Sequence, residues 1–319
     1  MKNHLRFAII LVAIFLNASC NKEDGNDPIN QPDTYSSTSQ FLAANAVPLQ
    51  TFVINATTGG TFTTSQGTEV IIPANAFITQ SGSPVTGSVQ IKFKDVYKKS
   101  DMLFDKLSTH MLFGGPIKSA GMFFIKAGQG SQEVILDAGK KITVNQPLNG
   151  LPLDTQMVAL DMARDSIDVG WVFPPMGTPS NPANSIIYTA TDYVFSFYQF
   201  STPLDSGTWC NSDNPGYFSG NPITTLTLNP LDNANTFQTD VFLLFNNVNS
   251  MIHVYRSGAT FKYYYAPQGS QCTMVAVGVK DGKLYASFKP VTITNNLTVN
   301  FTLTETTLDL FKTQLNLLN

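Results

Sequence analysis

The chain has 319 residues, 43% of them hydrophobic, which is enough to build the cores of two domains of ordinary size. Charged residues make up only 13% and the formal net charge is −3, so the sequence lacks the basic surface that nucleic-acid binding requires. A surface with so few charges must be made largely of Thr, Ser, Asn and Gln, which is typical of the solvated faces of antiparallel sheets. We therefore expect an all-β fold and no nucleic-acid partner.

The N-terminus has the pattern of a secretory signal peptide. Lys2 and Arg6 supply positive charge, residues 7–16 are an uninterrupted apolar run, and small residues precede Cys20. The run is too short to span a bilayer. The alternative interpretation is a short buried helix, but a polar linker follows directly.

Residues 1–19 resemble a bacterial lipoprotein signal peptide, although Asn17 stands where the common lipobox carries Leu. The resemblance implies cleavage before Cys20, lipid attachment to Cys20 and anchoring to the outer membrane. Three acyl chains would hold the protein stably, because each buried CH₂ contributes roughly 0.8 kcal/mol.

Three charged residues follow the expected lipid attachment site: Lys22, Glu23 and Asp24. They resemble the signal that exports Bacteroidetes-type lipoproteins to the cell surface. A charged start to the linker is the alternative, in which case the protein faces the periplasm. The resemblance implies a lipid-anchored protein exposed at the cell surface.

The rest of the chain divides by pattern. Residues 20–45 are rich in Pro, Asp, Asn and Ser and lack apolar periodicity, which predicts a flexible, lipid-anchored linker. Short strands with period-two alternation follow. We expect a β-sandwich over residues 46–148, a hairpin and connecting β region over 149–220, and a C-terminal β-module over 221–319, so that two β-sandwich-like modules make up the folded part.

The run GGTFTTSQGTEVIIPANAFI at residues 59–78 has a paired glycine, a strand ending in Pro and a small-residue turn. It resembles the start of a ZU5 domain, and the resemblance covers about residues 53–147. ZU5 domains are β-sandwiches that act as protein-interaction modules, and in some proteins a neighbouring segment cuts itself at His-Phe-Ser. That tripeptide does not occur in this sequence, so the resemblance implies a binding or structural role.

The C-terminal part carries two strong local signals. Asp281-Gly282 predicts a tight hairpin turn between two strands. Thr306 with Asp309 resembles a capping box, and the leucines and Phe311 that follow have helical spacing. We expect a short C-terminal helix that covers the last sheet, although the same apolar stripe could dock a partner.

Two cysteines remain once Cys20 carries lipid. Cys210 and Cys272 could form a disulfide in an oxidising compartment, or could be two buried free thiols. His110 and His253 are far apart in the sequence and lack the spacing of metal ligands. We expect structural roles for both histidines, and no metal or cofactor.

The sequence contains no catalytic motif. No Ser lies in a Gly-x-Ser-x-Gly elbow. Asp161, Asp165 and Asp168 flank an expected hairpin turn, and we interpret them as solvated charge rather than as the paired carboxylates of a glycoside hydrolase. Asp165-Ser166-Ile167 resembles the tripeptide that Bacteroidetes O-glycosylate on exported proteins, which makes Ser166 a possible acceptor.

These observations favour a non-enzymatic, membrane-anchored lipoprotein with a binding or structural role and a protein or glycan partner. One alternative is an accessory glycan-binding protein of a nutrient-uptake system. It would need an exposed aromatic platform, and Tyr263-Tyr264-Tyr265 could supply one, although strand aromatics usually pack within a sheet. The other is a hydrolase whose site residues converge from separate loops.

Overall fold

Strands dominate the computed structural model of the protein, with 52% of residues in strands and 9% in helices. The structure describes residues 34–164, 168–177, 183–198, 208–231 and 238–319, and Thr34–Asn319 forms one unit. The expectation of an all-β fold with a short C-terminal helix is confirmed. Four sheets pack in pairs, and each pair encloses a hydrophobic core.

The first pair of sheets, which we call the N-terminal sandwich, uses strands from residues 50–214. Its larger sheet has the order β1-β5-β6-β13-β9-β10, with β7 beside β6 and β4 beside β7. In β5, apolar residues occupy every second position, so burial alternates along the first six residues. The strands are β1 (Gln50–Asn55), β4 (Phe77–Thr79), β5 (Ser88–Val96), β6 (Lys118–Gln129), β7 (Gln132–Leu136), β9 (Val158–Arg164), β10 (Val169–Val172) and β13 (Thr208–Asn214).

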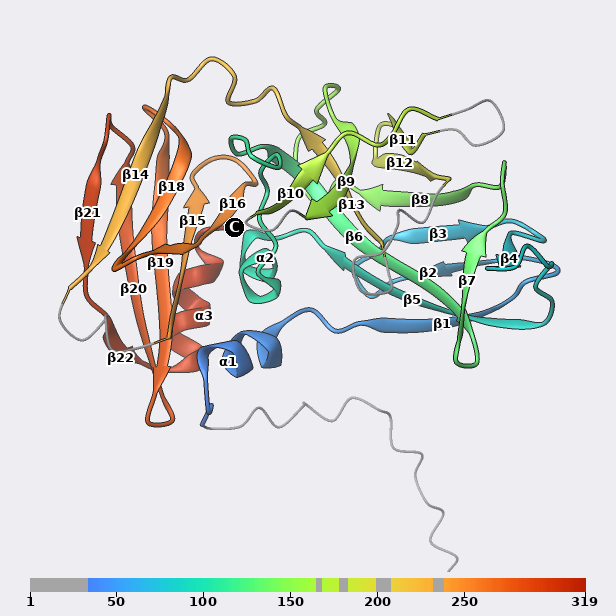
Figure 1. Ribbon diagram of the computed structural model, residues 1–319, viewed down its shortest axis with the longest axis horizontal. Coiled ribbons are helices and arrows are strands. Elements are labelled where there is room, and N and C mark those ends of the chain that lie inside the picture. Colours follow the sequence, from blue (N-terminus) through green and yellow to red (C-terminus); the bar gives the residue numbers. More distant parts are fainter. Residues whose placement is uncertain (1–33, 165–167, 178–182, 199–207, 232–237) are drawn as a thin grey trace, which may run out of the picture. The chain divides into compact units, whose positions relative to one another are not determined.

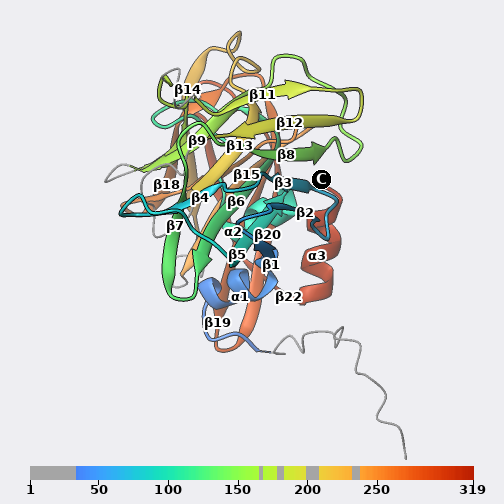
Figure 2. The same cartoon turned by 90° about the vertical axis from the view of Figure 1, so that its right-hand side faces the viewer.

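The smaller sheet of the N-terminal sandwich has the order β11-β12-β8-β3-β2. Figure 2 shows β12, β8 and β3 running side by side. Aromatic residues join the two sheets, since the Phe123 ring lies 5.5 Å from Phe93 in its own sheet and 5.0 Å from Phe195 in the other. The strands are β2 (Gly60–Thr63), β3 (Glu69–Ile72), β8 (Ile142–Pro147), β11 (Ser185–Tyr188) and β12 (Asp192–Phe197).

The second pair of sheets, the C-terminal sandwich, begins at Ile223. One sheet has the order β17-β18-β14-β21 and the other β16-β15-β19-β20-β22. The β14–β21 pair is parallel and every other pair of the two sheets is antiparallel. The strands are β14 (Ile223–Pro230), β15 (Thr239–Phe245), β16 (Met251–Val254), β17 (Arg256–Ser257), β18 (Thr260–Pro267), β19 (Gln271–Lys280), β20 (Lys283–Thr292), β21 (Thr298–Phe301) and β22 (Thr304–Thr306).

Three helices fill the space between the sandwiches: α1 (Thr38–Asn45), α2 (Lys99–Asp105) and α3 (Leu308–Asn316) (Figure 1). They form a third core, the junction core, with residues of both sandwiches. Strand β19 is buried on both faces because Met274 and Ala276 face the core of its own sandwich while Val275 and Val277 face the junction core. The same two-sided burial explains its continuous apolar sequence.

A bridging segment, residues 108–110, fixes the sandwiches to each other through hydrogen bonds. The Thr109 amide donates to the Met251 carbonyl over 2.7 Å, and the Met251 amide donates to the Thr109 hydroxyl over 2.8 Å. The Ser108 hydroxyl accepts from the His253 amide over 2.7 Å. The other side of the segment holds β10, since the Trp171 indole donates to the Ser108 carbonyl.

The structure differs from the sequence-based expectations in two elements. Residues 38–45, expected within the flexible linker, form α1, because Ser37 caps the helix and Phe41 and Leu42 are buried in the junction core. The C-terminal helix is capped by Thr307 rather than Thr306, with the Thr307 hydroxyl accepting from the Leu310 amide. Within the described residues, no helix is long and apolar enough to cross a membrane.

The expected middle region, residues 149–220, shares its sheets with the region before it. Strand β13 lies between β6 and β9 in the larger sheet, and β12 pairs with β8 in the smaller one. The expected hairpin is present, because β9 and β10 pair antiparallel. Both regions therefore contribute to one hydrophobic core.

Candidate functional site

A pocket of about 470 Å³ lies where the two sandwiches meet, and we call it the junction pocket. Its volume is within the range of small-molecule sites. The C-terminal sandwich supplies residues 252–257 and 262–265, from β16, the short β17 and β18, and the N-terminal sandwich supplies His110, Phe113 and Asp168. At Tyr255 the chain passes from one sheet of the C-terminal sandwich to the other, which places the pocket at a sheet edge.

A β-bulge exposes two consecutive tyrosines in this pocket. On β14, Thr224 pairs with Ala266 and Leu226 pairs with Tyr263, so Tyr264 and Tyr265 together oppose a single residue. Strict alternation would bury one of the two, whereas a bulge redirects a side chain. Tyr264 is 55% exposed and Tyr265 is 38% exposed. The bulge thus converts the tyrosine run into an exposed aromatic surface.

The first histidine of the pocket is held by a carboxylate. The Nε2 atom of His110 lies 3.0 Å from Oδ1 of Asp168, whose oxygens also accept from the backbone amides of Phe113 and Val169, each over 2.9 Å. Burial raises the pKa of Asp168, but these hydrogen bonds outweigh it and the net pKa is below the ordinary value. Because the ionised carboxylate only accepts, His110 Nε2 carries a proton and donates it to this bond.

The second histidine is held in the same way. His253 Nε2 lies 2.9 Å from Oδ1 of Asp240, and the other oxygen of Asp240 pairs with the Lys106 ammonium over 2.8 Å. The His253 ring stacks on Phe242 with ring centroids 4.8 Å apart. The centroid of the Tyr255 ring also lies 4.8 Å from that of the His253 ring, with the two planes tilted by 57°. His253 therefore forms a rigid base for the exposed Tyr255 ring.

Two buried polar atoms of the pocket residues have no hydrogen-bond partner among the described residues: Nδ1 of His110 and the hydroxyl of Tyr263. Burial, followed by the nearby charge of Asp168, raises the pKa of Tyr263 well above its ordinary value, so its hydroxyl stays protonated. Unpartnered buried polar groups cost free energy unless a ligand or water meets them. Both atoms are buried, so a ligand in the pocket does not reach them unless the surrounding side chains move.

A second pocket of about 340 Å³ adjoins the first, and we call it the flanking pocket. His253 and Tyr255 line both pockets. Arg164, Trp171 and Trp209 are among the other residues that line it. The two pockets therefore meet at His253 and Tyr255.

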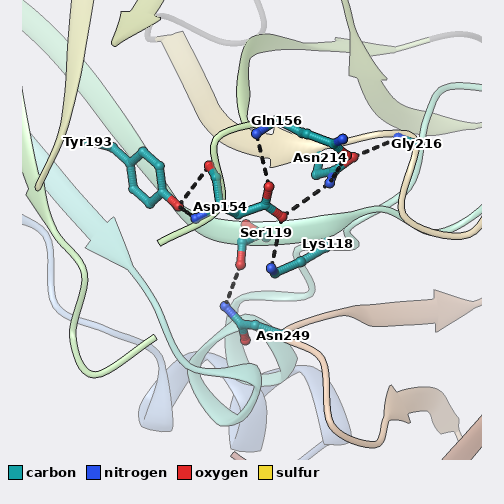
Figure 3. A network of polar contacts seen from close by, with 8 residues as sticks. All are labelled: Lys118, Ser119, Asp154, Gln156, Tyr193, Asn214, Gly216 and Asn249. Atoms are coloured by element: carbon teal, nitrogen blue, oxygen red, sulfur yellow. Dashed lines mark hydrogen bonds and ion pairs between the residues drawn. The ribbon is translucent and has the colours of Figure 1, made fainter. Parts of the chain in front are cut away.

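A third polar cluster surrounds Asp154 (Figure 3), and none of its residues lines either pocket. The Asp154 carboxylate accepts from the Lys118 ammonium over 2.8 Å, from the Asn214 amide over 3.1 Å and from the Gln156 backbone over 2.9 Å. The Tyr193 hydroxyl accepts from the Asp154 amide. Both oxygens of the Asp154 carboxylate thus accept hydrogen bonds from the protein, and we assign the cluster a structural role.

The structure brings together residues that the sequence separates widely. The sequence predicts structural roles for the two histidines, solvated charge at Asp168, and either sheet packing or an aromatic platform for residues 263–265. The structure places all of them around one pocket. Cys20, Lys22, Glu23, Asp24 and Ser166 lie outside the described residues.

The possible disulfide between Cys210 and Cys272 is not formed. Both are free thiols, and Cys210 is buried in the core of the N-terminal sandwich whereas Cys272 is buried in the core of the C-terminal one. Burial raises the pKa of Cys272 to about 12, so this thiol is protonated and unreactive at neutral pH.

Sequence reasoning missed Tyr255, Arg256, Lys262 and Phe113. Phe113 has a left-handed backbone (φ 54°) and is 45% exposed, which is unusual for a large apolar residue. Its sequence context, a Phe followed by Gly114-Gly115, is the signal that could have marked an exposed loop tip.

Comparisons with known proteins add no assignment. No protein-family model matches the chain, and a search of curated proteins finds no match. Among the described residues, no group of three or more His, Cys, Asp and Glu could hold a metal ion. The junction pocket is therefore the feature of the structure from which a function can be proposed.

Proposed function

We propose that the protein is a non-enzymatic lipoprotein, anchored through Cys20 to the outer membrane and exposed at the cell surface, that binds a glycan in the junction pocket. The signal-like residues 1–19 and the charged residues after Cys20 support the anchor. The resemblance of residues 53–147 to a ZU5 domain supports a binding role for the protein.

The observation that carries the glycan assignment is the exposed tyrosine pair on the β18 bulge. Flat aromatic rings pack against the apolar faces of sugar rings, while hydroxyl groups of the sugar need nearby polar partners. Tyr264 and Tyr265 provide the rings, and the Arg256 and Lys262 side chains that line the same pocket provide polar partners.

The hydrolase alternative has less support. A nucleophilic mechanism needs a hydroxyl or thiol hydrogen-bonded to a base. Within the described part of the chain, the Nε2 atoms of His110 and His253 bond to Asp168 and Asp240, and no side-chain hydroxyl bonds to either ring. The pocket is thus arranged to hold its histidines rigidly, which favours binding.

The first test replaces Tyr264 with Ala and measures binding of the lipid-free chain to a glycan array, followed by titration of the best glycan. Loss of one stacking ring should weaken the affinity about tenfold, or about 1.4 kcal/mol. The matched control is Tyr188→Ala, which removes a similarly exposed tyrosine (51%) from β11, outside the pocket. Unchanged affinity in Tyr264→Ala, or no glycan bound by the wild-type protein, would contradict the proposal.

The second test addresses the anchor. Cys20→Ala removes the thioether site, so the protein should move from the membrane fraction to the soluble fraction when cells are lysed. Asn21→Ala leaves the cysteine in place and should remain with the membranes. Cys20→Ala protein that still sediments with membranes would show that the anchor is not a lipid on Cys20.

A further inference from the structure

The junction pocket holds two basic side chains that lack acidic partners. Arg256 and Lys262 line it, and neither forms an ion pair with any described residue. The Arg256 guanidinium lies over the Phe261 ring, 4.6 Å from its centroid, which holds it in place without neutralising it. The one carboxylate that lines the pocket, Asp168, is already bonded to His110.

The flanking pocket also contains a basic side chain that has no acidic partner among the described residues. Arg164 lines it and forms no ion pair within the described part of the chain. The carboxylate that lines it, Asp105, is paired with Lys94 over 2.5 Å, and Lys106 is paired with Asp240. Among the described residues, each pocket therefore presents at least one positive charge with no acidic partner.

We infer that the ligand is an oligosaccharide with acidic sugar units, bound with one unit against Tyr264 near Arg256 and Lys262 and the next across Tyr255 toward Arg164. This inference depends on the proposed glycan-binding function and names the class of glycan. Arginine pairs with carboxylates through two parallel hydrogen bonds, so a uronic acid matches the site.

Other ligands use only part of this arrangement. A neutral glycan would occupy the tyrosine faces but would leave the three basic side chains without an acidic partner among the described residues and the ligand. An acidic peptide would pair with the basic side chains but would not use the exposed ring faces. Of these three ligands, a chain of acidic sugar rings is the one that uses the aromatic surface and the charges in both pockets.

The experiment titrates the lipid-free chain by calorimetry with tetragalacturonate and with its methyl ester, which has the same rings and linkages but no charge. The acid should bind at least about tenfold more tightly than the ester at low salt, and the difference should shrink as salt is added. Arg256→Gln and Lys262→Gln should each weaken binding of the acid severalfold and leave the ester unaffected. Thermal melting of each variant confirms that it is folded.

The matched control is Lys141→Gln, which removes the same charge from an exposed residue just before β8, outside both pockets. It should bind the acid as the wild type does. Ester and acid binding equally well would overturn the acidic-sugar inference while leaving the glycan-binding function intact. Equal binding of a short polyglutamate would show that charge alone is recognised and would also overturn it, as would Lys141→Gln weakening binding as much as Arg256→Gln.

Discussion

Asp240 shows how a single residue can hold the site together. It accepts from His253 under the junction pocket and from Lys106, the residue that ends α2 in a left-handed conformation (φ 55°). Burial raises the pKa of Asp240, but the hydrogen bonds and charges of His253 and Lys106 outweigh it, so the net pKa is below 3.8. The carboxylate thereby ties β15, β16 and the end of α2 into one ionised unit.

This depressed pKa predicts a specific acid sensitivity. The unfolded chain binds the Asp240 proton at higher pH than the folded protein does, so the contribution to stability is fully present above the ordinary pKa of 3.8 and is lost as the pH falls through the lower folded value. Asp240→Asn should therefore lower the free energy of unfolding by roughly 1–3 kcal/mol at neutral pH, and the difference from wild type should shrink below pH 3.8.

Thermal or urea unfolding across that pH range provides the measurement. Asp281→Asn is the control, because Asp281 is an exposed turn residue with a left-handed backbone (φ 52°) that asparagine also adopts. A difference between wild type and Asp240→Asn that stays constant down to the lowest pH would contradict the account.

At the scale of elements, the sequence predicted correctly the features that a few neighbouring residues determine by themselves. The Asp281-Gly282 turn is confirmed: both residues have positive φ (52° and 76°), and β19 and β20 pair up to Lys280–Lys283. The tyrosine surface could not be predicted, because the bulge depends on how β18 pairs with β14, a strand distant in sequence. Likewise, α1 carries no strong periodicity of its own and is stabilised by Phe41 packing in the junction core.

Helix α3 supplies the element-scale prediction. Phe311 is fully buried, with ring centroids 5.4 Å from those of Phe41 and of Phe288, so it joins α1, α3 and β20. Phe311→Ala should lower the free energy of unfolding by about 3–5 kcal/mol in a denaturant titration. The neighbouring Leu310 is 51% exposed, and Leu310→Ala should change it by less than about 1 kcal/mol. Similar effects of both substitutions would show that α3 does not pack as described.

At the scale of the whole unit, the site exists because two sandwiches share a core. Residues 108–110 hydrogen-bond to β16, and this register brings His110 beside residues more than a hundred positions later in the chain. The spacing of residues within one segment does not show which distant segments come into contact. The sequence therefore predicted the strands and individual aromatic residues but not the pocket. The docking also brings the pocket lined by Arg164 and the pocket lined by Arg256 together at Tyr255, although the two arginines come from different sandwiches.

Hydrogen exchange measured by mass spectrometry, with and without the glycan selected on the array, tests the central claim most directly. A ligand bound in the junction pocket should slow exchange of backbone amides in residues 108–117 and 251–265 together, because both sandwiches line the site. Amides of β2 and β3, in the smaller sheet of the N-terminal sandwich, serve as the internal reference and should be unchanged. Protection confined to segments outside these two ranges, with the junction pocket unaffected at saturating glycan, would contradict the account.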